Sequence, residues 1–254
     1  MLSRVVAALS FFTRLPLWRL VRIDASAYKR VVPLWPLAGC VTGGVMAGVL
    51  WAAQQAFPVE VSVVLALLSR LLLTGALHED GLADFCDGFG GGTTRERTLA
   101  IMKDSRIGTY GVLGLIIYAL LLTATLTSLG QQAGTPRLCA LLFCADVFAK
   151  WASSHIVNLL PYARNEQTAK NRLVYERMTV AEQCIGLVIG LLPSLLLLPV
   201  HLWWVMGPSL AAALLMMLAA WRRLRGYTGD CCGATVLISE LTFLLAALAL
   251  RTQA

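Results

Sequence analysis

The stretch VEVSVVLALLSRLLLTGALHEDGLADFCDG, residues 59–88, joins a long apolar run to a cluster of acids. Four acidic residues stand within nine positions of its second half, although the whole chain of 254 residues has only 14. If the helix of the apolar run continues through the acids, Asp80, Asp84 and Asp87 share one face at positions i, i+4 and i+7. Carboxylates that close repel one another, so we expect a cation among them, and oxygen ligands favour Mg²⁺. The alternative, a solvated acidic helix end, gains nothing from placing its acids in one stripe beside a membrane.

Composition assigns the whole chain to the class of membrane proteins. Hydrophobic residues make up 58% of it and charged residues 14%, whereas a soluble domain carries about 25% charged residues. The length allows about seven spans of about 20 residues with short loops, which leaves no room for a separate soluble domain. We expect an all-α, polytopic membrane helix bundle that forms one domain over residues 1–254. The expected spans are about 32–54, 59–77, 108–130, 136–159, 180–198, 201–220 and 234–250.

The basic residues, which give the chain a net charge of +7, are gathered in alternate connections between these spans. The rich segments contain Arg4, Arg14, Arg19, Arg22, Lys29 and Arg30; then Arg95, Arg97, Lys103 and Arg106; then Arg164, Lys170, Arg172 and Arg177; and finally Arg222, Arg223 and Arg225. Positive loops stay on the cytoplasmic side, so we expect a cytoplasmic N-terminus and a C-terminus on the far side. Basic and aromatic residues do not alternate as they do on a nucleic-acid surface, so no nucleic-acid partner is expected.

Residues 1–30 are expected to form a cytoplasmic or interfacial leader. Its apolar residues Val5, Val6, Leu9 and Phe12 could form one face of a short helix at the membrane surface. A signal peptide is the alternative, but the apolar run is short, Arg14 follows it closely and no small-residue cleavage site is evident.

Two further polar clusters could complete a site around the acids. At the mouth of the third span, Asp104 could complete a metal site while Lys103 and Arg106 clamp phosphate oxygens. Alternatively these residues are interfacial caps and snorkelling cations. Before the last span, Thr228-Gly229-Asp230-x-x-Gly233 forms a turn that delivers one carboxylate to a helix start, unless Asp230 is only an N-cap.

Ionisable residues also stand inside the expected spans, where they normally face protein or a polar cavity. Arg70 should therefore face the bundle interior or a phosphate, and Glu240 should face the interior. Asp146 and Lys150 stand at i and i+4 and could form a pair inside the bundle.

Clusters of carboxylates, cations and glycines on one membrane face fit Mg²⁺-dependent phosphoryl transfer. Carboxylates would hold the metal, cations would neutralise a pyrophosphate and one carboxylate would accept a proton. Asp84-Phe85-Cys86-Asp87-Gly88 has the D-x-x-D-G form of the CDP-alcohol phosphotransferases, but Gly91-Gly92 stands where that family has Ala-Arg. Such a phosphotransferase is the nearer alternative. A cation transporter is the more distant one, because it would need acids near the bilayer midplane and paired repeats.

Three motifs resemble a closer family, the adenosylcobinamide-GDP ribazoletransferases, also called cobalamin synthases. They are His78-x-Asp80-Gly81-Leu82-Ala83-Asp84-x-x-Asp87-Gly88, Ile101-Met102-Lys103-Asp104-Ser105-Arg106-Ile107-Gly108-Thr109, and Thr228-Gly229-Asp230-x-x-Gly233-Ala234. Shorter similarities are Ser10-Phe11-Phe12-Thr13-Arg14-Leu15-Pro16, Pro36-Leu37-Ala38-Gly39 and Tyr162-Ala163-Arg164. All fall in order over essentially the whole chain.

The resemblance implies an enzyme of the bacterial cell inner membrane, multi-pass and Mg²⁺-dependent, with its active site on the cytoplasmic face. Its substrates would be adenosylcobinamide-GDP and α-ribazole, or α-ribazole 5′-phosphate, joined with release of GMP in the last assembly step of the vitamin B12 nucleotide loop. Membrane lipid surrounds such an enzyme, and a second copy of the chain and other B12-assembly enzymes are further candidate partners.

The resemblance also implies roles for particular residues. Asp80, Asp84, Asp87 and Asp104 would bind metal; Asp84 and Asp87 would be catalytic, one of them as the base; Lys103, Arg106, Arg164 and Asp230 would contact substrate. Two positions depart from the family pattern: Leu237 stands where the family usually has Glu, and Lys150 stands where it tends to have Arg. Lys150 keeps the charge but lacks the two-pronged guanidinium.

Overall fold

A computed structural model describes residues 2–19, 21, 23–164 and 174–251 of the chain. Within these residues the regular elements are helices, and an isolated bridge joins Tyr162 to Tyr227. The α-helices are α1 Leu2–Phe12, α2 Ala25–Lys29, α3 Trp35–Ala53, α4 Val59–Thr74, α5 Leu77–Gly91, α6 Arg95–Ile101, α7 Thr109–Ala133, α8 Thr135–Ser154, α9 Ile156–Leu159, α10 Val180–Leu197, α11 Met206–Leu224 and α12 Gly229–Arg251. The 3-10 helices are η1 Leu17–Arg19, η2 Val32–Leu34 and η3 Val200–Val205.

The long apolar runs of the sequence form the long helices of the bundle. Six helical segments of the described residues are long and apolar enough to cross a membrane: Val32–Ala53, Thr109–Ala133, Thr135–Leu159, Val180–Leu197, Val200–Leu224 and Gly229–Leu250. A seventh crossing results if α4 and α5 are counted as one broken span. The expected all-α, polytopic membrane bundle is therefore confirmed, while the side of the membrane on which the N-terminus lies stays a prediction.

The helix of the apolar run does not continue into the acids. Helix α4 ends at Thr74, and α5 leaves it at an angle of 90°. Gly75 and Ala76, between them, both adopt left-handed backbone conformations, with φ of 67° and 58°. Alanine in that conformation costs about 1–2 kcal/mol, and nothing in the sequence marks Ala76 for it. The three aspartates therefore lie on a helix of their own.

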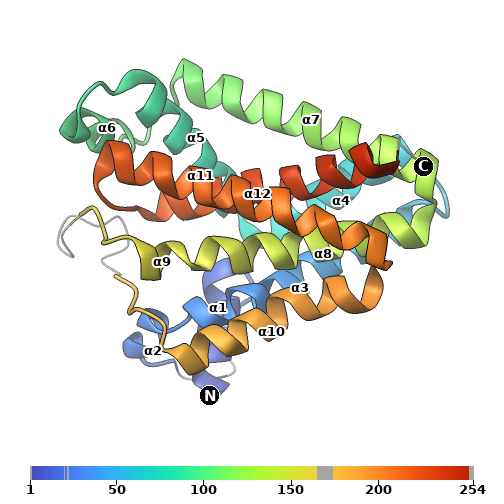
Figure 1. Ribbon diagram of the computed structural model, residues 1–254, viewed down its shortest axis with the longest axis horizontal. Helices are drawn as coiled ribbons and strands as arrows, with labels where there is room; N and C mark the ends of the chain where they lie inside the picture. Colours follow the sequence, from blue (N-terminus) through green and yellow to red (C-terminus); the bar gives the residue numbers. More distant parts are fainter. Residues whose placement is uncertain (1, 20, 22, 165–173, 252–254) are drawn as a thin grey trace.

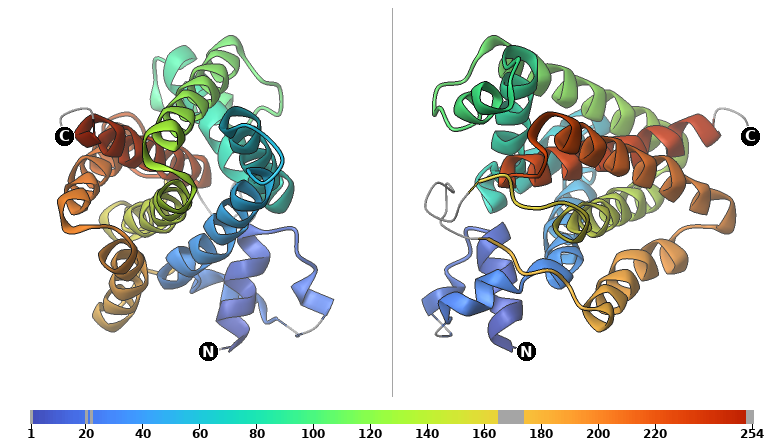
Figure 2. Two further views of the ribbon diagram at one scale, coloured as in Figure 1. Left: turned by 90° about the vertical axis from the view of Figure 1, so that its right-hand side faces the viewer. Right: turned by 60° about the vertical axis from the view of Figure 1, so that its left-hand side comes forward.

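Helices α8 and α12 form the centre of the bundle. The share of buried residues is 83% in the crossing that contains α8 and 61% in that of α12, against 39% or less in the other four. Close packing of α3 on α8 needs small residues, since a methyl group on Gly39 would lie 2.8 Å from the Cα atom of Val147. Figure 2 shows the remaining long helices around these two.

Ionisable side chains inside the bundle are paired, as the sequence predicts. Arg70 is 2% exposed, and its guanidinium contacts carboxylate oxygens of Glu240 at 2.6 Å and Glu79 at 3.0 Å. Asp146 pairs with Lys150 one turn away on α8. The predictions that Arg70 and Glu240 face the interior, and that Asp146 pairs with Lys150, are confirmed.

The polar connections meet at one end of the bundle. Figure 1 shows α6, α9 and the α11–α12 connection at this end and the C-terminus at the other. The guanidinium of Arg95 on α6 donates to the Leu224 carbonyl oxygen at 2.7 Å and to the Ala163 carbonyl oxygen at 2.8 Å. Segments more than sixty positions apart in the sequence are thereby held side by side.

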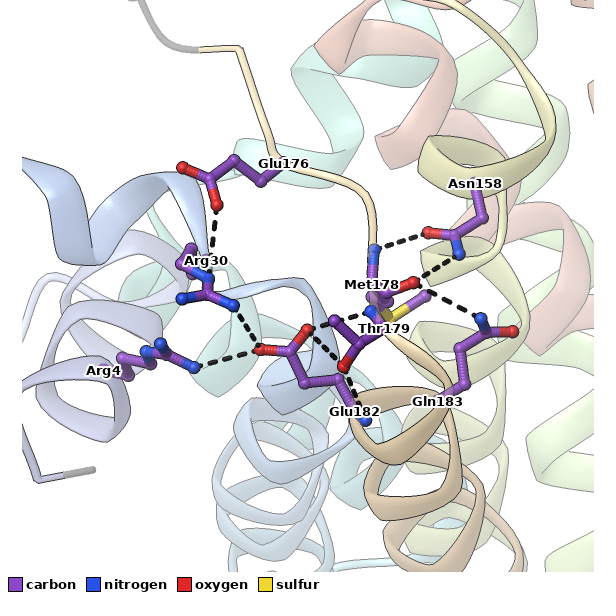
Figure 3. Close-up of polar contacts among 8 residues, drawn as sticks. All are labelled: Arg4, Arg30, Asn158, Glu176, Met178, Thr179, Glu182 and Gln183. Carbon is purple, nitrogen blue, oxygen red and sulfur yellow. Dashed lines mark hydrogen bonds and ion pairs between the residues drawn. The ribbon is translucent and has the colours of Figure 1, made fainter.

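The leader is tied to α10 through Glu182. Arg4 on α1 and Arg30 after α2 both bind its carboxylate, at 3.0 Å and 3.4 Å, while Arg30 also reaches Glu176 at 3.2 Å (Figure 3). The predicted short leader helix is present as α1, and its Val6 and Phe12 are buried. The leader therefore packs on the bundle, and this brings Phe12 to the site described next.

Candidate functional site

A cavity of about 230 Å³ lies among α5, the start of α12 and the connection between α9 and α10. Three charged residues line it, one from each of these segments: Asp80, Asp230 and Arg164. The rest of the lining includes five aromatic rings and one imidazole, from Phe11, Phe12, Trp35, Tyr162, Tyr175 and His78. Of the three polar clusters of the sequence, the acidic stretch and the segment 228–233 contribute residues to this lining, whereas the segment 103–106 contributes none.

Two glycines let α5 and α12 approach closely enough to bring the carboxylates to one space. A methyl group on Gly81 would lie 3.0 Å from the backbone oxygen of Asp230. One on Gly233 would lie 3.2 Å from the backbone oxygen of His78. Such contacts are tighter than side chains normally make with backbone, so both motifs need glycine at these positions.

Asp230 is presented at the start of α12, but it is not the capping residue. The hydroxyl of Thr228 accepts a hydrogen bond from the backbone N–H of Cys231 and donates one to the Asp230 carboxylate at 3.2 Å. Thr228 therefore satisfies an otherwise unpaired N–H group at the helix start. Asp230 is buried and lines the cavity instead.

The connection carrying Arg164 is held by backbone pairing. The backbone N–H of Ala163 donates to the carbonyl oxygen of Tyr227 at 2.8 Å, and the backbone N–H of Tyr227 donates to the carbonyl oxygen of Pro161 at 2.9 Å. The guanidinium of Arg164 donates one hydrogen bond to the Leu99 carbonyl oxygen, at 3.0 Å. Burial raises the pKa of Tyr162, whose neutral phenol also lines the cavity. These contacts fix the position of one cation and one O–H donor in the site.

Asp87, the last of the predicted trio, joins α5 to the start of α7. Its two carboxylate oxygens accept the backbone N–H groups of Gly108 at 2.7 Å and Gly111 at 2.8 Å. A methyl group on either glycine would lie 2.5 Å from an Asp87 oxygen, so the glycines make room for the carboxylate. A carboxylate at a helix N-terminus is favoured by unpaired N–H groups and by the helix dipole.

A second hollow, of about 580 Å³, lies beside Asp87 and contains the cluster before α7. Asp104 and Arg106 both line it and pair with each other, with one guanidinium nitrogen 2.8 Å from an Asp104 oxygen. Hydrogen bonds from Arg106 lower the pKa of Asp104 to about 2. Arg97 on α6 lines the same hollow, and Lys103 is exposed.

The predicted residues thus fall in two neighbouring places. Asp80, Arg164 and Asp230 line the cavity, whereas Asp87, Asp104 and Arg106 line the hollow. Half-buried Asp84 lies on α5 between Asp80 and Asp87. The roles assigned to all of these residues and to Lys103 stay predictions.

The carboxylates of the site can be compared with what Mg²⁺ requires. In the described part of the chain, no three His, Cys, Asp or Glu side chains are grouped so that they could hold a metal ion. The structure therefore does not gather Asp80, Asp84, Asp87 and Asp104 into one cluster. Mg²⁺, however, keeps several waters and commonly takes one or two carboxylates together with substrate phosphates. Asp80 and Asp230, with Arg164 nearby, are a donor set of that kind, so the cavity fits the ion together with a phosphate.

Sequence interpretation missed the aromatic lining and Arg97. Phe11 and Phe12 stand in a short motif near the N-terminus, and His78 opens the acidic motif. The place of His78 at the start of the acidic motif could have marked it as a site residue. The lining residues Trp35 and Tyr175 have no such signal, because they reach the cavity only through the packing of distant segments.

Comparison with known proteins shows that the chain is similar to adenosylcobinamide-GDP ribazoletransferases over nearly its full length. The chain is 39% identical over 253 residues to the adenosylcobinamide-GDP ribazoletransferase of Leptothrix cholodnii, covering 95% of this chain and 93% of the relative. It is 35% identical over 236 residues to the protein of that name from Shewanella baltica strain OS185, covering 93% and 90%. No solved structure matches the chain. The family described as Cobalamin-5-phosphate synthase matches residues 4–248. The chain therefore belongs to the Cobalamin-5-phosphate synthase family.

Proposed function

We propose that this chain joins adenosylcobinamide-GDP to ribazole, or to ribazole 5′-phosphate, and releases GMP in the assembly of the cobalamin nucleotide loop. The names of its relatives and of its family support this reaction. The single structural observation that carries it is the cavity in which Asp80, Asp230 and Arg164 meet. Two carboxylates beside a guanidinium suit the binding and transfer of a phosphoryl group.

Charge neutralisation is the first task of these residues. The Arg164 guanidinium would bind phosphate oxygens of the activated substrate, and Asp80 with Asp230 would hold Mg²⁺. When bound, the ion would neutralise pyrophosphate charge in the transition state. Arg97 and Arg106, which line the neighbouring hollow, and the exposed Lys103, next in the chain to Asp104, would attract the remaining phosphate.

Proton transfer is the second task. A ribazole hydroxyl oxygen would form a bond to the phosphorus that carries the cobinamide arm, while the bond from that phosphorus to the GMP oxygen breaks. We assign acceptance of the hydroxyl proton to Asp84, which lies on α5 one helical turn from the cavity residue Asp80. Asp87 already uses both oxygens on backbone N–H groups, so its contribution is to hold α7 against α5.

GMP release by the purified, full-length protein in detergent or nanodiscs tests this proposal. We expect GMP from adenosylcobinamide-GDP with α-ribazole, and a loss of GMP release when Mg²⁺ is chelated and its restoration when Mg²⁺ is added back. A CDP-alcohol with a lipid alcohol should give no CMP. Folded protein that releases no GMP would refute the reaction, and release of CMP would favour the alternative phosphotransferase.

We also infer that the protein lies in the bacterial inner membrane with this cavity on the cytoplasmic side. The alternation of basic connections supports the orientation. Seven crossings would then place the C-terminus outside the cytoplasm. A C-terminal alkaline phosphatase fusion should be active and a C-terminal green fluorescent protein fusion dark; the reverse pattern would contradict the orientation.

A further inference from the structure

Part of the cavity is built from aromatic rings that contact one another. We name it the aromatic box, and its members are Phe11, Phe12, Trp35, His78 and Tyr175. The Phe12 ring stacks on the His78 imidazole at 5.5 Å between centroids, and its edge contact with Trp35 measures 5.7 Å. Tyr175 contacts both Phe11, at 5.9 Å, and Trp35, at 5.6 Å. The members come from α1, α3, α5 and the segment before α10, so folding assembles the box from distant parts of the chain.

The box contains buried polar atoms that have no protein partner. His78 and Trp35 are each 2% exposed, and both line the cavity. Both imidazole nitrogens of His78 and the indole Nε1 of Trp35 have no hydrogen-bond partner within the described part of the chain. Buried polar groups are normally paired, and leaving one unpaired is costly. Because both residues line the cavity, a ligand bound there is a candidate to supply the missing partners.

The chemistry of the box specifies a flat, mostly apolar ligand with an acceptor on its edge. Aromatic side chains favour stacked and edge-to-face contacts with other rings. The indole N–H of Trp35 can only donate, so the ligand atom that faces it must accept a hydrogen bond. His78 can offer a second donor or a single acceptor, depending on its tautomer.

This inference rests on the proposed function, which offers two aromatic bases. Guanine carries several polar groups on its edges, and its N1–H and amino group need acceptors. Ribazole is the nucleoside of an alkylated benzimidazole, whose base is apolar apart from one free ring nitrogen that accepts. The box offers five rings, and its indole can only donate a hydrogen bond. This combination matches the benzimidazole base of ribazole.

We propose that the aromatic box binds the benzimidazole base of ribazole, with the Trp35 N–H donating to its free ring nitrogen. This places the nucleoside in the same cavity as Asp80 and Arg164, where its ribose hydroxyl can approach the phosphate that Arg164 would bind. The contacts of Arg4 and Arg30 with Glu182 hold the leader, and with it Phe11 and Phe12, in place before ribazole arrives (Figure 3). Such preorganisation favours binding.

Trp35→Phe tests the assignment, because it removes the N–H donor and keeps an aromatic ring. Loss of one hydrogen bond should raise the KM for α-ribazole and the Kd of α-ribazole in equilibrium dialysis by ~10-fold. The kcat and the KM for adenosylcobinamide-GDP should stay within about twofold. Trp204→Phe is the matched control, since Trp204 is 78% exposed on η3, outside the cavity lining.

A second arm changes the ligand. The indole analogue of α-ribazole replaces the free ring nitrogen by C–H, so wild-type protein should bind it ~10-fold more weakly than α-ribazole. Trp35→Phe should bind the two compounds equally. If Trp35→Phe does not fold, the comparison of the two ligands on wild-type protein remains decisive, because equal binding there would overturn the proposal.

The other outcomes are also distinct. If Trp35→Phe raises only the KM for adenosylcobinamide-GDP, the box binds guanine. If the KM values for both substrates are unchanged, the box binds neither base. Both results would overturn the inference. If wild-type protein binds α-ribazole with the expected preference but releases no GMP, the proposed reaction fails while the box is supported.

Discussion

Gly81 lies so close to Asp230 that a methyl group on Gly81 would come within 3.0 Å of the Asp230 backbone oxygen. The contact joins two motifs about 150 positions apart in the sequence and sets the distance between α5 and α12. It therefore controls the spacing of the segments that bring Asp80 and Asp230 to the same cavity.

Gly81→Ala should separate these helices slightly. Overpacking of this kind costs about 1–3 kcal/mol, and misplacement of the carboxylates should lower GMP release by ~10-fold or more. The measurements are the free energy of unfolding in mixed micelles and the initial rate. Gly48→Ala on α3 is the control, because a methyl group there meets no atom within 4 Å. Equal activity of the two variants would show that the close contact does not matter.

Asp84→Asn should abolish turnover and leave membrane insertion intact. The amide keeps the shape of the side chain but cannot accept the hydroxyl proton, and loss of such a group lowers rates by ~10²–10⁴-fold. Glu96→Gln, an exposed change on α6, is the control for loss of a negative charge. Near-normal GMP release by Asp84→Asn would remove Asp84 from the site.

Asp87→Asn should behave differently from Asp84→Asn. The amide keeps one oxygen that can accept an N–H from α7, but its NH₂ group faces the other backbone donor and cannot accept from it. Loss of one buried charged hydrogen bond predicts a destabilisation of about 1.5–3 kcal/mol. We expect the unfolding midpoint to fall and the activity of the remaining folded protein to be reduced less than in Asp84→Asn. An unchanged midpoint with abolished turnover would instead assign Asp87 to the chemistry.

Asp104 should remain ionised at every pH at which the enzyme can be assayed. Arg106 lowers its pKa to about 2, from an ordinary value of 3.8. Because the folded-state pKa is lowered, the ion pair is fully present above about pH 4 and is lost as the pH falls through about 2. Arg106→Gln should return the pKa of Asp104 towards its ordinary value. Carbon NMR of protein labelled at aspartate, with Asp104→Asn to assign the signal, measures both values; an ordinary pKa in wild-type protein would contradict the pairing.

The sequence predicted the bundle well because membrane spans follow from the lengths of apolar runs. The same reasoning found the interior positions of Arg70, Asp146 and Glu240, since charges inside a membrane must be paired. The turn between α4 and α5 was missed because it depends on Ala76 with φ of 58°, a conformation without a sequence signal.

The site was predicted only in part, for a related reason. Helical spacing alone put Asp80, Asp84 and Asp87 together, but whether a carboxylate faces a cavity or a backbone N–H depends on the neighbouring helix. Asp80 lines a cavity together with residues of α12, whereas Asp87 binds the start of α7, 21 positions further along the chain. The aromatic lining comes from packing between distant segments, which no local pattern records.

The cluster around Arg70 should be essential for stability, because it joins four helices inside the membrane. Its guanidinium contacts Glu79 on α5, Glu240 on α12 and the Tyr118 hydroxyl on α7. Arg70→Met would leave two carboxylates buried without their cation, and removal of one partner of a buried ion pair typically costs about 3–5 kcal/mol. Arg222→Met, an exposed arginine near the end of α11, is the matched control and should change stability by about 0.5 kcal/mol or less.

Arg70→Lys separates the charge of this side chain from its shape. A single ammonium group cannot reproduce the two-pronged contact with Glu79 and Glu240, so the loss of stability should lie between those of wild type and Arg70→Met. The free energy of unfolding in mixed micelles gives the order of the three proteins. If Arg70→Met is as stable as the wild-type protein, the buried cation is not what joins the four helices.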